Sequence, residues 1–156
     1  MVLPFQDATG LAGDADAELA FALQGRGRGV TFVLPTRLQE ALDRSPGLGG
    51  RIRGLSVGAF GAAEVKRVGD PLYGDLRRVA SLVDAEVALV PLRLWVEPGT
   101  AGSRLRASAA LLHVRTGRVL WFGFVEGEPR DPADPGALAQ VVERLARTLL
   151  WYAQEP

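Results

Sequence analysis

The chain has 156 residues, 47% of them hydrophobic, so it is long enough to bury a core and is most simply one domain over residues 1–156. Its 18 basic and 18 acidic residues balance, which excludes the overall positive field that drives non-specific binding to nucleic acid or anionic membranes. Cysteine is absent, which excludes disulfides, thiolate metal sites and thiol nucleophiles.

The chain begins directly in an apolar, strand-like segment at residues 2–5, with no lead-in. It has no basic stretch followed by an apolar stretch, as a signal peptide has, and no apolar run approaches the roughly 18 residues that span a bilayer. Natural chains seldom begin inside their first core strand. Two expectations therefore stay open: the chain starts here, or a leader or anchor precedes it.

A helix and a second strand are expected after the first loop. Asp14 or Asp16 can cap a helix that runs to Gln24, because a carboxylate accepts hydrogen bonds from the free amides of the first turn. Residues 25–29, Gly-Arg-Gly-Arg-Gly, could clasp a phosphate. They lack the Gly-Lys-Ser/Thr end of a P-loop and follow a helix, so a flexible connection is favoured. Residues 30–34 are expected to form the strand.

The next helix opens at Pro35, where Thr36 and Gln39 have the spacing of a capping box. Residues 45–69 contain seven glycines and no sustained periodicity, so we expect a long irregular connection with a short extended piece at 55–57. Loops of this length are often binding surfaces.

Asp70 and Pro71 predict the start of a third helix, as its N-cap and first helical residue. One buried stripe is expected along it: Leu72, Leu76, Val79 and Val83. Residues 85–96 follow as a strand whose first half is apolar on both faces, as in a central strand. Pro91 has no amide hydrogen for a sheet and predicts a bulge or a local loss of pairing.

Residues 104–127 predict a hairpin. Alternating side chains at 105–111 and 119–125 indicate two strands with one face on a core. Gly117, in the turn between them, can adopt the positive φ that such turns usually need. Trp121 is expected to pack in the core.

A terminal helix is expected to start at Asp134 and Pro135. Its apolar face carries Leu138, Val141, Val142, Leu145, Leu149 and Tyr152. Trp151 falls on the opposite side with Arg144 and Arg147, where the helix should meet solvent.

The expected fold class is therefore α/β (α+β). We expect a mixed sheet of about five strands with helices packed on one or both faces. Residues 85–127 should form an antiparallel three-strand meander, followed by the terminal helix.

No catalytic, cofactor or metal site is expected. His113 is the only histidine, which excludes a histidine metal cluster, and a Ser-His-Asp arrangement would have to use a residue inside a strand. Asp7, Asp14 and Asp16 do not have the spacing of an EF-hand, and capping accounts for them.

Two other classes of function stay open beside an interaction domain. A small-ligand or nucleotide-binding module would be favoured if four arginines converged: Arg26, Arg28, Arg51 and Arg53. A hydrolase would be favoured by a buried pair of carboxylates in a pocket.

Aromatic and arginine side chains are the candidates for binding a protein partner. Trp151 with Arg147 and Arg144 makes a cluster of the kind enriched in binding hot spots. The alternative is that Trp151 folds over Arg147 in a cation-π contact. Trp95 shares a strand face with Arg93, and interface contact and packing on the sheet surface are both open for it.

Three segments carry a resemblance to a known family: VLPFQDATG at residues 2–10, LRRVASLVDAEVALVPLRL at 76–94 and ASAALLHVRTGRVLWFGFVEG at 107–127. In this order they resemble the TolB amino-terminal-domain and CsgG/LpoB-like group of bacterial cell-envelope proteins. The chain departs from the family pattern at Val114 and Arg115, where a Val-Asp pair is usual, and at Pro91, where glycine is common.

The resemblance implies a periplasmic or outer-membrane-associated domain that binds protein subunits of an envelope complex or a second copy of itself. It implies no enzymatic site, no cofactor and no nucleic-acid partner. Contact with a membrane is expected only through an anchor upstream of Met1.

Overall fold

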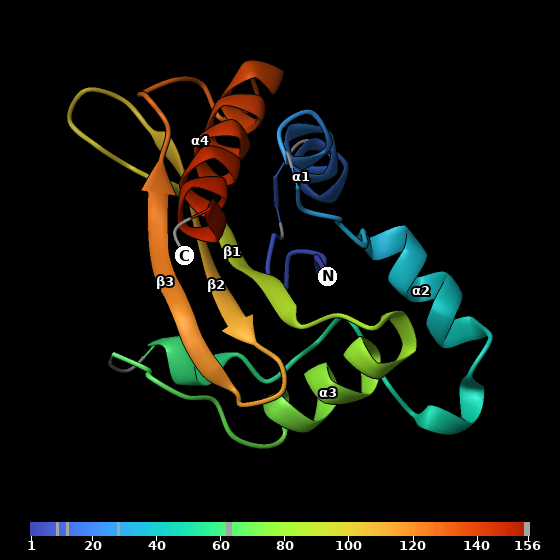
Figure 1. Ribbon diagram of the computed structural model, residues 1–156. Helices are drawn as coiled ribbons and strands as arrows, with labels where there is room; N and C mark the ends of the chain where they lie inside the picture. Colours follow the sequence, from blue (N-terminus) through green and yellow to red (C-terminus); the bar gives the residue numbers. More distant parts are fainter. Residues whose placement is uncertain (9, 12, 28, 62–63, 155–156) are drawn as a thin grey trace.

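The computed structural model describes the chain except for residues 9, 12, 28, 62, 63, 155 and 156, and its centre is an antiparallel sheet (Figure 1). The strands are β1 (Val87–Glu97), β2 (Arg104–His113) and β3 (Arg118–Glu126), in the order β1-β2-β3. This confirms the expected meander. Gly117 closes the β2–β3 turn with a φ of 69°, and the β1–β2 register shifts at the bulge that Pro91 predicts.

The expectation of about five strands is wrong, because neither residues 2–5 nor residues 30–34 form a strand in the described part of the chain. The N-terminal segment runs parallel to β1 but meets it only in isolated bridges, Val2 with Leu89 and Asp7 with Arg93. Residues 30–34 join this segment by a hydrogen bond from the Val2 amide to the Val33 carbonyl, at 2.8 Å.

The ladder between the N-terminal segment and β1 is interrupted for a local reason. On the β1 side, Pro91 has no amide hydrogen to donate to the N-terminal segment. The Phe5 amide donates to Asp16 Oδ1 at 2.7 Å instead of to β1. A pattern of apolar residues does not reveal this diversion.

The first two helices form as the sequence predicts, with one difference in capping. α1 (Ala15–Gln24) begins after Asp14, whose carboxylate accepts a hydrogen bond from a first-turn amide at 3.0 Å. α2 (Pro35–Asp43) has no capping box, because Leu34 is its N-cap and Thr36 already lies within the helix. Gln39 donates instead to the side chain of Asp43, at 2.8 Å.

The other two helices each follow an aspartate that accepts a hydrogen bond from an amide of the first turn, although Asp70 is not the N-cap that the sequence predicts. α3 (Leu72–Val83) starts one residue later than the sequence predicts, with Pro71 as its N-cap, and Asp70 accepts a hydrogen bond from the Gly74 amide. α4 (Pro135–Gln154) starts at the expected residue, and Asp134 accepts a hydrogen bond from the Gly136 amide.

The connection between α2 and α3 is packed, although it is irregular. It contains two short 3₁₀ turns, η1 (Pro46–Leu48) and η2 (Gly58–Gly61), and the extended piece expected at 55–57 is not a strand. The Gln6 side chain ties it to the N-terminal segment: it donates to the Ile52 carbonyl at 2.9 Å and accepts from the Leu55 amide at 3.0 Å.

The sheet is covered on both faces by different elements. Leu89, Leu94 and Ala107 pack with α1 and α4 on one face, and Val90 and Leu112 pack with α2, α3 and the 45–69 connection on the other. Figure 1 shows α4 running along the sheet with α1 beside it. Because successive strand residues point to opposite faces, this division fixes which side chains each surface can present.

Candidate functional site

Three aromatic rings form a row at the end of α4: Trp151 and Tyr152 of α4, and Trp121 of β3. Trp121 of β3 is half-buried, and its ring centre lies 5.9 Å from that of Tyr152. Tyr152 meets Trp151 edge to face at 4.8 Å. Trp151 is 58% exposed and Tyr152 is 41% exposed. We call these three residues the aromatic row.

The structure corrects two expectations for this region. Tyr152 is exposed instead of buried, and its ring lies against that of Trp121 on β3, the edge strand of the described sheet. Trp151 contacts Tyr152, whereas the guanidinium of Arg147 donates to Glu143 at 3.0 Å. The cation-π contacts in the described residues involve Arg77, Arg93 and Arg106, not Arg147.

Arg144 has an internal role that the sequence does not show. One of its guanidinium nitrogens donates to the Glu126 carbonyl at 2.7 Å, and another donates to the Glu128 carboxylate at 2.9 Å. Arg144 therefore holds residues 126–128, at the end of β3, close to α4. The structure assigns it to this link, and the exposed described residues toward the end of α4 are Arg147, Trp151 and Tyr152.

Glu143 joins α1 to α4. Its carboxylate forms ion pairs with Arg26, at the end of α1, and with Arg147 one turn further along α4. Burial acts to raise the pKa of Glu143, but hydrogen bonds and charge from the two guanidinium groups outweigh burial, so the pKa lies below its ordinary value.

A second cluster lies on the sheet, where Trp95 stands between two guanidinium groups. Arg93 and Arg106 lie 5.3 and 5.6 Å from its ring centre. Arg106 is the direct cross-strand partner of Trp95 and also lies 4.2 Å from the ring centre of Phe124, which is 59% exposed. Arg106 pairs with Glu97, and its Nε has no hydrogen-bond partner in the described structure.

The two clusters lie on opposite faces of the sheet. Leu94 and Ala107 point toward α1 and α4, so their strand neighbours Trp95 and Arg106 point to the other face. Trp121 packs on the α4 side. The interaction candidates identified from the sequence therefore form two separate surfaces. Arg106 and Phe124 were not among them, because only strand register places them beside Trp95.

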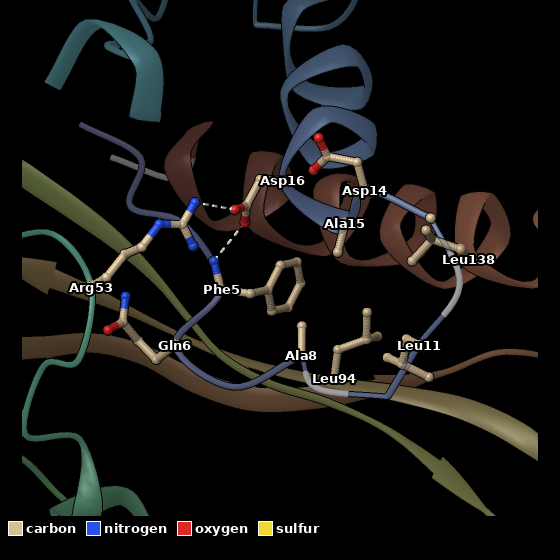
Figure 2. A pocket seen from close by; sticks show the side chains of 11 residues that line it. Phe5, Gln6, Ala8, Leu11, Asp14, Ala15, Asp16, Arg53, Leu94 and Leu138 are labelled. Carbon is tan, nitrogen blue, oxygen red and sulfur yellow. Dashed lines mark hydrogen bonds and ion pairs between the residues drawn. The ribbon is translucent and has the colours of Figure 1, made fainter. Parts of the chain in front are cut away.

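A pocket of about 400 Å³ lies at the start of α1, and its lining side chains are drawn in Figure 2. Asp16 bridges its wall, accepting from the Phe5 amide at 2.7 Å and from Arg53 at 2.9 Å. The Asp14 carboxylate, also in the lining, caps α1. Both acids thus have structural partners, in agreement with the capping interpretation for Asp14.

Three of the four arginines whose convergence would favour a ligand-binding module pair with three different carboxylates. Arg26 pairs with Glu143, Arg51 with Asp75 and Arg53 with Asp16. Arg28 lies outside the described residues.

Buried acids and histidine form no catalytic arrangement in the described part of the chain. Asp75 is the buried charged side chain there, and it pairs with Arg51 and Arg78. The His113 ring contacts the Thr116 hydroxyl at 3.1 Å. The described residues contain no cluster of three or more candidate metal ligands.

Comparisons of the chain with protein-family models, curated proteins and solved structures gave no match. None of the helices in the described residues is long and apolar enough to cross a membrane.

Proposed function

We propose that this chain is a non-catalytic protein-interaction domain, an accessory or scaffold component of a bacterial cell-envelope assembly. In this proposal it acts in the periplasm or at the outer membrane and binds protein subunits or a second copy of itself. The three sequence segments that resemble the TolB and CsgG/LpoB-like group supply the cellular setting. The exposed aromatic row supplies the binding surface.

The observation that carries the proposal is the exposure of Trp151. Leu145 and Leu149 already fill the core side of α4, at 0% and 3% exposure, and Trp151 is 58% exposed. A tryptophan in that position adds little to the core of the monomer. Tryptophan, tyrosine and arginine are the residues most enriched in binding hot spots, and Trp151, Tyr152 and Arg147 present all three.

Replacing Trp151 tests this surface. Trp151→Ala should leave the melting temperature nearly unchanged, because the ring is mostly in solvent. It should weaken co-purification with the native envelope complex, or self-association in sedimentation, by about 1 kcal/mol or more. The matched control is Phe21→Ala, because Phe21 of α1 is another aromatic side chain at the surface, 78% exposed.

Unchanged assembly of Trp151→Ala would contradict the proposal, as would an equal loss in Phe21→Ala. A large fall in the melting temperature of Trp151→Ala would show that the Trp151 side chain stabilises the folded monomer instead of serving a partner. We also propose that the chain has no hydrolase activity, since Asp75 and His113 have the structural partners described above.

A further inference from the structure

The turn between β2 and β3 lies beside a shallow depression of about 490 Å³. It is lined by Lys66, Arg67, His113, Arg115, Thr116 and Arg118. Four of these six residues are permanent cations, and none is acidic. In a chain with no net charge, this is a strong local concentration of positive charge.

Among the described residues, the four cations have no carboxylate partner. The described hydrogen bonds and ion pairs include none made by the side chains of Lys66, Arg67, Arg115 or Arg118, whereas most other arginines pair with carboxylates. A neighbouring hollow shares Arg115 and contains Asp84 and Glu86. No described ion pair joins either acid to the four cations.

Strand pairing places two of these cations directly opposite each other. Arg67 lies opposite Arg118 in an isolated antiparallel bridge, and on its other side Arg118 pairs with His113 of β2. Like charges directly opposite each other destabilise a sheet. An anion bound between Arg67 and Arg118 would remove this repulsion, which gives the arrangement a physical reason to hold one.

The backbone around the depression is held in place. The Val68 amide donates to the Gly117 carbonyl at 2.8 Å, and the Tyr73 hydroxyl donates to the Arg115 carbonyl at 2.7 Å. A Cβ atom at Gly117 would lie 2.8 Å from the Val68 carbonyl oxygen, so a side chain there would push the two segments apart. The cationic side chains therefore extend from a fixed scaffold.

We propose that this depression binds a phosphate group. Guanidinium groups match the geometry of phosphate oxygens and bond them bidentately, and the lining supplies three arginines, a lysine and a hydroxyl. The volume accommodates a phosphate with a substituent attached. The group can belong to a free phosphate compound or to a phospholipid headgroup, since both offer the same chemistry.

Calorimetric titration with inorganic pyrophosphate, at constant ionic strength set with NaCl, tests the site. The variant Arg67→Ser/Arg118→Ser should lower the association constant at least tenfold. The control variant Arg37→Ser/Arg44→Ser removes the same charge from two exposed positions, one on α2 and one at its C-cap, and should change the association constant less than twofold. In buffer without phosphate, the site variant should melt at the same temperature as the parent chain or higher, because the repulsion between the like charges of Arg67 and Arg118 has been removed.

Flotation with vesicles distinguishes the two sources of the phosphate. Binding of pyrophosphate that depends on Arg67 and Arg118 supports a free ligand. Binding only to phosphatidylcholine vesicles that contain phosphatidic acid, lost in the site variant, supports a lipid headgroup. Binding of neither probe to the parent chain overturns the proposal. Equal binding by the parent chain and the site variant also overturns it.

Discussion

At the scale of single residues, Trp121 connects the sheet to the exposed end of α4. Its ring is half-buried against the core beneath α4 and touches Tyr152, which touches Trp151. A change at Trp151 therefore acts at the surface, whereas a change at Trp121 also removes support from beneath the aromatic row.

Replacing Trp121 by alanine should lower the free energy of unfolding by about 2 kcal/mol. A fully buried aromatic side chain would cost about 3 to 5 kcal/mol, and only part of this ring is removed from water. Urea denaturation measures the difference. A loss below about 1 kcal/mol would show that the ring is peripheral, and a loss above about 4 kcal/mol would place it in the core.

At the scale of elements, α1 and α4 are joined by packing and by the carboxylate of Glu143. Arg26 reaches this carboxylate from the end of α1, and Arg147 reaches it from within α4. Glu143 is 29% exposed in its side chain, so water only partly screens the link.

Glu143→Gln should lower the free energy of unfolding by about 0.5 to 1 kcal/mol at pH 7. The folded pKa of Glu143 lies below its ordinary value of 4.5. The stabilisation is therefore fully present above pH 4.5 and is lost as the pH falls through the folded pKa. Urea denaturation at pH 7 and pH 3 should show that the difference between parent and variant shrinks in acid.

Glu40→Gln is the control, because Glu40 pairs with Arg37 only within α2 and is half exposed. It should cost less than Glu143→Gln at pH 7. If the difference in free energy of unfolding between the parent and Glu143→Gln stays constant from pH 7 to pH 3, the carboxylate charge of Glu143 does not join α1 to α4.

At the scale of the whole molecule, the N-terminal segment holds the two halves of the core together. Val2 and Phe5 pack with α1 and α4, and Leu3 packs with α2 and α3. The amino group of Met1 donates to the Val87 carbonyl at 2.7 Å, yet burial lowers its pKa from 8.0 to about 6.

For the chain of residues 1–156 with a free amino group at Met1, the free energy of unfolding should therefore rise between pH 6 and pH 8. In that range the unfolded amine, with a pKa near 8.0, binds more protons than the folded amine, so raising the pH favours the folded state. The full change is on the order of 2 kcal/mol, present above pH 8 and lost as the pH falls through 6.

Urea denaturation at pH 5.5, 7.0 and 8.5 measures this dependence. A chain acetylated at Met1 keeps every other titrating group and should show a flatter profile. Identical profiles for the free and acetylated chains would show that the amino group makes no contribution.

Sequence periodicity and capping were enough to locate the main elements. The four helices, the hairpin with Gly117 and the bulge at Pro91 follow from contacts within a few residues, and such contacts are readable along the chain. The exposure of Trp151 also follows from its place on the helix wheel.

Only the tertiary structure decided how many strands pair and which charged groups meet. The Phe5 amide donates to Asp16 and not to a sheet, and Arg144 donates to the carbonyl of Glu126, the last residue of β3. Trp95 has a register partner, Arg106, that lies eleven positions along the chain. These hydrogen bonds and pairings form between residues that are distant in the sequence and that tertiary packing brings together. A single sequence contains no information on such distances.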